Sequence, residues 1–523
     1  MEKEYVVVVH KGVDLEEFDA ELAASTGSAA IPNRSVDIAN PRIGSKRMTH
    51  WMLTDKEAAL LESDPRVLSV EIPVDKRNDI IIGKRAFQNA NFNKPTILNS
   101  NEVNWGLRRC IEETNIYQNG LTTNNQYGYA LDGRGVDIVI QDSGLQVDHP
   151  DFFDYHGNTR VRQIDWYAAS GLTGTQSVNH YRDTDGHGTH CAGIAAGLTY
   201  GWAKSADIYS QKLAGLEGTG DSGSGIPIAD SFDAIRLWHL AKTNGRPTVV
   251  NMSWGYFSQI TGNPTGGTYR GSIWNYGVSY PNDVALWAAT GLVIPQDGVS
   301  RFIPARIPSV DAEIDDMIAA GIHVIIAAGN DLYKGDLPGG DDYDNTVVYG
   351  AEIYYYHRGS SPYSPDAFIV GNSDDNAQLD GAVYKDKTAN STSRGPRLDL
   401  FAPGTNIIST CSTSSIYATT NYAPDPEFKI AMINGTSMAA PQVAGVIAQH
   451  LQVNPNYTPA QIKTRINSDA KAAMFSTGLD NDYAVFGTSL LGAPNRFLYS
   501  KYGIQPVQTN GTTSLKNVKV VLG

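Results

Sequence analysis

Three short, mostly apolar runs constrain the fold of this chain more than any other feature. They cover residues 136–140, 248–252 and 323–328. The third run directly follows a helical stretch, residues 310–320, that ends at Gly321. Apolar strands separated by helices are typical of a parallel sheet covered on both faces. The sequence therefore predicts an α/β domain with functional residues at the carboxyl ends of its strands.

The first 75 residues show a different pattern. Helical stretches begin at Asp14 and after the capping-box sequence Thr54-Asp55-Lys56-Glu57. Room for a further strand remains between residues 28 and 45. The clear strands are predicted at residues 5–10, 47–53 and 67–72. We therefore predict a small α+β, ferredoxin-like domain over residues 1–75.

The segment after this domain lacks sustained periodicity. Residues 76–104 are rich in Asn and carry the basic pairs Lys76-Arg77 and Lys84-Arg85. These features favour an exposed linker, where proteolytic cleavage concentrates. We expect the main domain at residues 105–500 and a C-terminal tail at residues 501–523.

Charge and composition exclude several classes of protein. The chain has 523 residues and a net charge of -14, which disfavours nucleic acid as a partner. No apolar run is long enough to cross a bilayer, so no membrane partner is expected. The N-terminus lacks the pattern of a secretory signal, which favours a cytoplasmic or virion-associated protein over classical secretion. The three cysteines, Cys110, Cys191 and Cys411, do not form a disulfide framework.

Two of the segments that carry chemistry contain an Asp and a His. In the segment 139–144 a buried strand ends at Asp142 before a Gly, although many aspartates at such places are only caps or turn formers. In the segment 185–193 His187 stands between two glycines and opens a helix of small residues. Its neighbour His190 raises the alternative of a metal site, but no matching Cys or carboxylate pattern accompanies the pair. We therefore expect a structural role for His190.

Two further segments contain a Ser and an Asn. Ser437 follows Gly435-Thr436 and enters a helix of small residues, where its N–H faces the site that favours an anionic oxygen. An N-cap role is the simple alternative for this Ser. Asn330 ends the strand 323–328 after Gly329, and its amide could cap the chain or stabilise an oxyanion.

Together these segments resemble the subtilisin-like serine proteases, the subtilase family. The sequences Asp-Ser-Gly, His-Gly-Thr-His and Gly-Thr-Ser-Met-Ala occur in the order of that family. The resemblance covers about residues 105–500 and implies a three-layer α/β domain with a mostly parallel sheet. It also implies a serine endopeptidase whose triad is Asp142, His187 and Ser437. Asn330 and Thr436 would contribute to the oxyanion hole, and the chemistry would need no cofactor.

The resemblance extends to substrate binding. Ser253-Trp254-Gly255 matches the family segment that pairs with an extended peptide, by strand addition. Ala327-Ala328-Gly329 would form the other wall of the pocket for the residue before the cut. Their small side chains predict a roomy apolar slot, unless they serve only close packing. Cys191, which follows the His motif as in the proteinase K branch, is expected to be a buried hydrophobe.

Two aspartates match calcium ligands of relatives. Asp399, with carbonyl groups near Pro365, is the candidate for a structural calcium ion; a turn aspartate is the alternative. Asp151 matches a ligand of a second calcium site, but its partner loop after His187 is missing from the sequence. Calcium is therefore expected at most as a structural ion.

The chain departs from the family pattern at several places. Residues 256–308 and 331–364 are longer than usual and predict inserted loops or a lobe at the edges of the cleft. Gln442 stands where the family usually has His, with little expected effect on chemistry. The N-terminal domain resembles the inhibitory propeptide, so it would act as an intramolecular inhibitor that is cut off within residues 76–104. A permanently attached accessory module is the alternative.

A non-catalytic scaffold and an α/β-hydrolase esterase are the alternatives to a peptidase. A non-catalytic scaffold or virion protein fits the missing signal and the long insertions, but it has no need for Asp142, His187, Asn330 and Ser437 together. An α/β-hydrolase esterase places its Ser first in the chain and within a Gly-x-Ser-x-Gly turn, which Ser437 lacks. The motifs therefore favour a peptidase with a polypeptide substrate.

Overall fold

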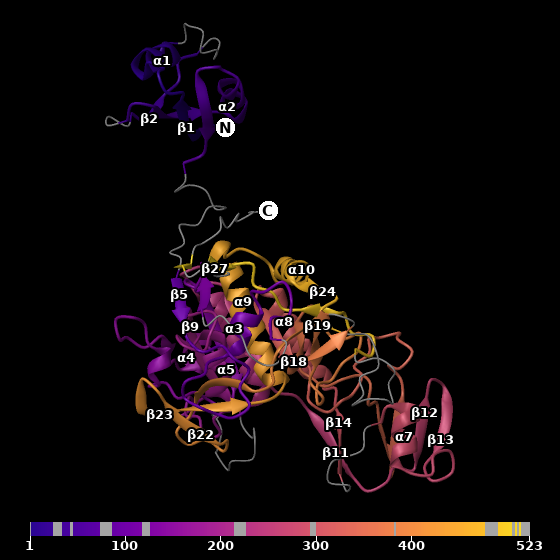
Figure 1. Cartoon of the computed structure of the whole chain (residues 1–523). Coiled ribbons are helices and arrows are strands. Elements are labelled where there is room, and N and C mark those ends of the chain that lie inside the picture. Colours follow the sequence, from indigo (N-terminus) through magenta and orange to yellow (C-terminus); the bar gives the residue numbers. More distant parts are fainter. Residues whose placement is uncertain are drawn as a thin grey trace. The chain divides into compact units, whose positions relative to one another are not determined.

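The computed structural model divides the chain into two compact units, Met1–Ile82 and Gly83–Val521 (Figure 1). The described residues are 2–24, 34–41, 45–73, 86–117, 126–213, 226–292, 300–380, 383–475, 490–504, 508–509 and 512–513. Lys76-Arg77 and Lys84-Arg85 lie outside them.

The smaller unit is an antiparallel sheet with two helices. Its strands lie in the order β2-β3-β1-β4, and the additional strand expected between residues 28 and 45 is β2. Trp51 and Phe18 are buried in its core. The elements in chain order are β1 (Lys3–Val9), α1 (Leu15–Ala23), β2 (Ile38–Asn40), β3 (Met48–Leu53), α2 (Asp55–Glu62) and β4 (Val67–Glu71). This order is that of the ferredoxin-like α+β domain predicted from the sequence.

The capping box predicted at the start of α2 is confirmed. The Thr54 hydroxyl accepts the N–H of Glu57, and the Glu57 carboxylate accepts the N–H of Thr54 at 2.7 Å. Arg34 donates to the same carboxylate, which holds the pKa of Glu57 at about 2. These contacts satisfy the orphan donors at the helix start.

The larger unit is built on one central sheet. Its strands lie in the order β24-β25-β20-β18-β15-β10-β7-β9-β8, with β19 paired to β18. All neighbours from β25 to β8 are parallel. The strands are β7 (Asp137–Asp142), β8 (Val161–Arg162), β9 (Asp207–Lys212), β10 (Thr248–Met252), β15 (His323–Ala327), β18 (Phe368–Asp380), β19 (Val383–Thr388), β20 (Leu400–Pro403), β24 (Lys471–Ala472) and β25 (Arg496–Phe497). The predicted mostly parallel sheet is confirmed.

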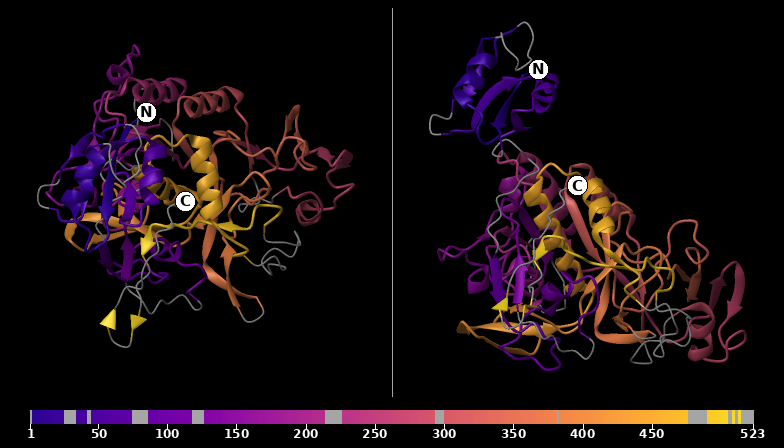
Figure 2. Two further views of the ribbon diagram at one scale, coloured as in Figure 1. Left: turned by 90° about the horizontal axis from the view of Figure 1, so that it is seen from above. Right: turned by 45° about the horizontal axis from the view of Figure 1, so that its top comes forward.

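Helices cover both faces of this sheet and make three layers (Figure 2). α5 and α9 pack together on one face, where α9 contacts β10, β15 and β18. α4, α6 and α8 pack as a second group, in which α8 also contacts β15. The helices are α3 (Trp105–Arg109), α4 (Trp166–Ser170), α5 (His187–Ala196), α6 (Ile228–Ala241), α7 (Asp283–Thr290), α8 (Pro308–Ala319), α9 (Thr436–Val453) and α10 (Pro459–Asp469), with a 3₁₀ turn at Pro150–Phe152. None of the described helices combines the length and apolar character needed to cross a bilayer.

Residues 86–104 pack within the larger unit, which differs from an exposed linker. β5 pairs with β6, Phe92 is in the core, and Asn104 is buried and donates to Gln442 and Tyr200. Irregular backbone with such buried contacts has no periodicity that a sequence pattern could reveal. Smaller sheets of the unit are made by β5 (Ala86–Asn89), β6 (Gln126–Tyr129) and β26 (Gly503–Ile504), by β21 (Ile407–Cys411), β22 (Thr419–Tyr422) and β23 (Asp425–Ile433), and by β27 (Gln508–Thr509) and β28 (Thr512–Thr513).

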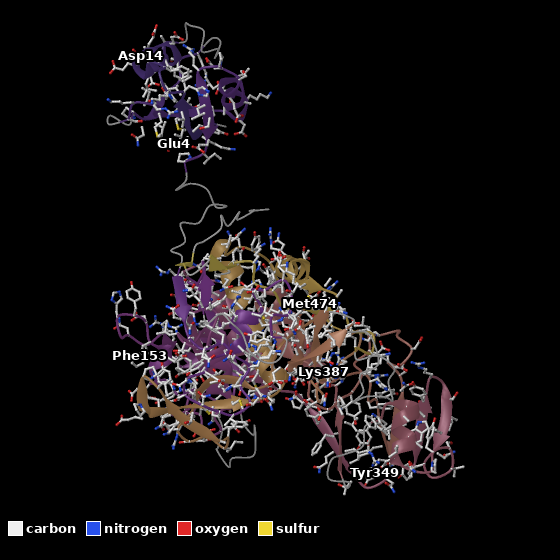
Figure 3. The ribbon with its side chains drawn as sticks, viewed as in Figure 1. Glu4, Asp14, Phe153, Tyr349, Lys387 and Met474 are labelled. Atoms are coloured by element: carbon white, nitrogen blue, oxygen red, sulfur yellow. The ribbon has the colours of Figure 1, made fainter. Side chains whose placement is uncertain are left out.

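The two insertions form one lobe of the larger unit, seen apart from the central sheet in Figure 1. β12 from the first insertion pairs with β16 from the second, which carries Tyr349 (labelled in Figure 3). The lobe has its own core around Ile260, Trp274 and Tyr356. Its strands are β11 (Phe257–Thr261), β12 (Gly266–Tyr269), β13 (Ser272–Asn275), β14 (Ser300–Pro304), β16 (Thr346–Tyr349) and β17 (Glu352–Tyr354).

Candidate active site

A carboxylate and an imidazole meet where β7 ends and α5 begins. His187 Nδ1 lies 2.8 Å from Asp142 Oδ1, and the N–H of Ser143 also donates to that oxygen. Asp142 is fully buried, whereas 13% of the His187 side chain is exposed. A Cβ on Gly188 would lie 2.2 Å from the carbonyl oxygen of Gly144, so only Gly lets α5 approach the end of β7 this closely. The glycine after His187 thus allows the close contact between the Asp142 carboxylate and the His187 ring.

The environment of His187 sets its protonation. Burial opposes the charged ring, but the Asp142 carboxylate and Cys191 together outweigh it and raise the pKa of His187 well above the ordinary value. A ring that is hydrogen-bonded through Nδ1 offers Nε2 to the cavity. His187 is thereby arranged to exchange a proton at Nε2.

Asp183 organises the turn that presents His187, and the sequence reading missed it. Its carboxylate accepts the Ser143 hydroxyl at 3.0 Å, the Gly186 N–H at 2.8 Å and the Thr189 N–H at 2.9 Å. It therefore ties the end of β7 to the first turn of α5. Its position four residues before His187 was the available signal, but a single Asp there also fits a simple turn.

Ser437 stands in the first turn of α9. Its hydroxyl donates to the carbonyl oxygen of Ser253 at 3.1 Å, and the Ser253 hydroxyl donates to the carbonyl oxygen of Ser437 at 2.9 Å. The first N–H groups of a long helix favour negative charge nearby. The hydroxyl therefore lies beside a site suited to an oxyanion, and rotation about χ1 is the movement that would redirect it.

Asn330 is held in a defined orientation by Thr436. Its Oδ1 accepts the N–H of Thr436 at 2.9 Å and the hydroxyl of Thr436 at 3.1 Å. The Thr436 hydroxyl in turn accepts the N–H of Gly329, which has φ +101°. The amide oxygen is engaged on the protein side, and no described residue accepts a hydrogen bond from the NH₂ group, which can donate toward the cavity.

One cavity of about 290 Å³ joins these groups. Among the described residues, its lining brings together the sequence-predicted Asp142, His187, Ser253, Trp254, Gly255, Ala327, Gly329, Asn330, Thr436 and Ser437. Ala328 instead lines a smaller neighbouring cavity. Phe257, Asp331 and Ser360 also line the main cavity but were missed, because each belongs to an insertion with no family pattern to identify it.

Cys191 and His190 lie beside the site without taking part in it. Cys191 Sγ is 3.4 Å from the carbonyl oxygen of Ser437, and burial raises the pKa of this thiol. His190 Nε2 lies 3.1 Å from the carbonyl oxygens of Ile407 and Ala431. Asp142, His187 and Cys191 place possible ligand atoms within 4.8 Å of one another, and the hydrogen bond between His187 Nδ1 and Asp142 Oδ1 accounts for part of this closeness.

The surroundings of Asp399 do not fit a calcium ion. Lys463 Nζ lies 3.0 Å from Asp399 Oδ1 and donates to the carbonyl oxygens of Pro365 at 2.7 Å and Ala367 at 2.6 Å. These are the carboxylate and carbonyl oxygens that the calcium expectation required. An ammonium group of this chain therefore stands among these oxygen atoms, where the calcium ion was expected.

Asp151 has a comparable environment. Its Oδ1 accepts the N–H of Thr199 at 2.7 Å, and Lys204 Nζ nearby donates to Gln88 Oε1 at 3.1 Å and to the carbonyl oxygen of Leu198 at 2.7 Å. Burial lowers the pKa of Lys204 to about 7, although the Asp151 carboxylate opposes this. Lysine again lies among the oxygen atoms near a family-matched aspartate.

Comparison with known proteins shows the family to which the chain is similar. Residues 133–486 match the model of the subtilase family. The chain is 26% identical over 412 residues to an extracellular serine proteinase of Thermus sp. (strain Rt41A), covering 79% of this chain and 68% of that protein. It is 25% identical over 366 residues to the subtilisin-like serine protease Pen c 2 of Penicillium citrinum, covering 70% of this chain and 58% of that protein.

Coverage of the relatives varies. Several fungal relatives are matched over little more than half of their own length, for example 52% for a subtilisin-like protease of Coccidioides posadasii (strain C735). Among solved structures, a cold adapted subtilisin-like serine proteinase matches with a TM-score of 0.46 and 22% identity, over 76% of this chain and 97% of that one.

Proposed function

The chain belongs to the subtilase family of serine endopeptidases, and we propose that Asp142, His187 and Ser437 are its catalytic triad. The observation that carries this proposal is the 2.8 Å contact between His187 Nδ1 and Asp142 Oδ1, beside a cavity that Ser437 also lines. The order of the three residues along the chain is the family's order.

The proposed reaction begins with the Ser437 hydroxyl. It turns from the Ser253 carbonyl oxygen to His187 Nε2, which accepts its proton while Oγ attacks the peptide carbonyl. Asp142 stabilises the imidazolium that forms. His187 then gives the proton to the leaving amine, and water hydrolyses the acyl-enzyme by the same steps in reverse.

Asn330 and the N–H of Ser437 would stabilise the oxyanion. The support for Asn330 is its orientation, because Thr436 engages the amide oxygen and leaves the NH₂ group for the cavity. Donors already fixed before the reaction need no reorganisation when the charge develops. The peptide would lie along Ser253-Trp254-Gly255, with the side chain before the cut between this segment and Ala327.

The decisive experiment uses a serine-directed fluorophosphonate probe. We expect the wild-type protein to be labelled and Ser437→Ala to remain unlabelled, with a loss of about 10⁶ in kcat. Ser253→Ala is the matched control and should still be labelled. Equal labelling of wild type and Ser437→Ala would reject Ser437 as the nucleophile. Absence of labelling in both, after removal of the N-terminal unit, would favour the scaffold alternative.

We further propose that Met1–Ile82 is an inhibitory propeptide. Its ferredoxin-like fold and its position before the catalytic unit support this role. Cleavage would lie before Ala86, because β5 pairs with β6 of the larger unit. N-terminal sequencing of active protein should find a new end before residue 86, and Ser437→Ala should stay uncut. Full activity with Met1 retained would reject the precursor.

A further inference from the structure

The cavity of the proposed active site contains a carboxylate with no catalytic assignment. Asp331 follows Asn330 and lines the cavity together with Gly329 and Ser360. Its Oδ2 lies 3.8 Å from the position that a Cβ on Gly329 would take. The other carboxylate of the cavity, Asp142, is already committed to His187. Asp331 is therefore the acidic group that a bound substrate side chain would meet.

In the described part of the chain, no Lys or Arg pairs with Asp331. Its recorded polar neighbour is the backbone N–H of Asn330. Two arginines of this region have other partners: Arg301 donates to Asp283 and to the carbonyl oxygen of Gly262, and Arg397 donates to the carbonyl oxygen of Ser360. Among the described residues the carboxylate thus has no counter-ion.

Burial destabilises the ionised form of the Asp331 carboxylate when no cation is nearby. It raises the pKa of Asp331 to about 6, and the Asn330 N–H only partly offsets it. At neutral pH the group is ionised yet poorly solvated. A cation brought by a ligand would gain more from such a carboxylate than from an exposed one.

The remaining walls suit an aliphatic chain. Gly255, Ala327 and Gly329 are small, and the Phe257 ring stands at the edge of the cavity. Long basic side chains lay their methylene groups along apolar surface and leave the charged head for a polar partner. A neutral apolar residue would fill the same slot but leave Asp331 without a partner.

We propose that Asp331 is a specificity-determining residue, which selects substrates with Lys or Arg immediately before the cleaved bond. This inference rests on the proposed function, because it takes the cavity as the pocket for that side chain. The ammonium or guanidinium head donates to the Asp331 carboxylate while the stem packs between Gly255 and Ala327. The pocket is therefore selective for basic residues rather than simply apolar.

The test compares peptides that differ only in the residue before the cut: Lys, Met of similar length, or Glu. With protein matured from the full chain at pH 8, kcat/KM for Lys should exceed that for Met by about tenfold or more, since a hydrogen bond to a charged group has that size. Asp331→Asn should bring the Lys and Met values together, because the carboxylate that distinguishes the two side chains is lost. Asp341→Asn, an exposed carboxylate of the same lobe, is the matched control and should retain the preference.

The ratio of the Lys and Met values also reports the titration of Asp331. It should fall as pH decreases through about 6 and become flat in Asp331→Asn, whereas the ionisation of His187 affects both substrates alike and cancels. The other titratable or charged groups facing this region are Tyr333, Asp142, Arg301, Arg394 and Arg397.

Three results would overturn the inference: a Lys-to-Met ratio near one at pH 8, a preference for Glu, or a ratio that survives Asp331→Asn. A protein that cleaves none of the peptides would count against the proposed function instead. In that case dissociation constants of the same peptides for Ser437→Ala still decide about Asp331. Tighter binding of the Lys peptide, lost in the Ser437→Ala/Asp331→Asn double variant, supports it, and equal binding refutes it.

Discussion

Two of the aspartates that match the family, Asp142 and Asp399, differ in their surroundings. At the end of β7, Asp142 contacts His187, the partner that the proposed chemistry needs. At Asp399, the carboxylate contacts Lys463, which also binds the carbonyl oxygens of Pro365 and Ala367. Asp142 contacts the expected partner, His187. Asp399 contacts the Lys463 ammonium group at the place where a calcium ion was expected. A matching residue therefore indicates a role only together with the atoms around it.

The largest expected effect concerns Asp142. Asp142→Asn should reduce kcat by about 10⁴, because the amide no longer stabilises the imidazolium or its tautomer. The reaction needs a neutral His187, so activity is lost as pH falls through the pKa of that ring. Since Asp142 raises this pKa, the acid limb of kcat/KM should move to lower pH in the variant. A pH–rate profile of both proteins measures this.

An unchanged melting temperature is the control for this variant. If the acid limb of kcat/KM stays at the same pH in Asp142→Asn, Asp142 does not set the pKa of His187. The proposed role of the Asp142–His187 contact would then be rejected.

A smaller effect is expected at the oxyanion side of the cavity. Asn330→Ala should lower kcat by about 10² to 10³ with little change in KM, because the lost donor acts mainly in the transition state. Thr436→Val removes only the hydroxyl that orients Asn330, so its loss should be clearly smaller. Steady-state kinetics on one peptide ranks the variants. Equal losses would contradict a supporting role for Thr436.

The environment of Asp399 is tested by Lys463→Ser. Removing the ammonium leaves Asp399 and two carbonyl oxygens without their cation, which should cost about 3 kcal/mol of unfolding free energy. Urea denaturation measures the loss, and millimolar calcium should restore part of it. The wild-type melting temperature should not respond to calcium or EDTA.

Lys242 provides the matched control for this variant. It pairs with Asp137 at 2.8 Å, but Arg246 lies 2.6 Å from the same carboxylate. Lys242→Ser should therefore be destabilised without any recovery in calcium. Stabilisation of the wild-type protein by calcium would contradict the conclusion that Lys463 takes the place of calcium beside Asp399.

The smallest effect on activity is expected at Gln442. It stands where the family usually has His, yet it accepts the indole N–H of Trp202 at 2.6 Å and exchanges hydrogen bonds with Asn104 at 3.1 Å. Gln442→Met should cost about 2 kcal/mol, because these buried groups lose their partner. kcat should change less than twofold. A large fall in kcat with intact stability would give this position a role that its contacts do not explain.

Local pattern was sufficient for the central strands. The run 248–252 is β10 as predicted, and the run 323–328 differs from β15 by one residue at its end. Such strands are buried on both faces, so their hydrophobicity is visible without knowledge of their neighbours. The grouping of Asp142, His187 and Ser437 was expected from family motifs and not from periodicity.

Contacts between distant segments could not be predicted in the same way. Lys463 lies on α10, far along the chain from Asp399, and nothing in its local sequence indicates that its ammonium reaches the Pro365 carbonyl. The short strands of the two insertions were also hidden, because Gly-, Tyr- and Asn-rich segments suggest loops when read alone. Their pairing partners decide their structure.

The pairing of β12 with β16 has a consequence for the history and engineering of this chain. Gly267 from the first insertion faces Val347 from the second, and Tyr356 donates to the Thr290 carbonyl oxygen across the same boundary. Deleting either insertion would leave β12 or β16 without its partner strand and would expose the hydrophobic core that the two insertions share. The two insertions therefore form one structural unit built from two separate segments of the chain. Transfer of this lobe to a relative without insertions would require both segments.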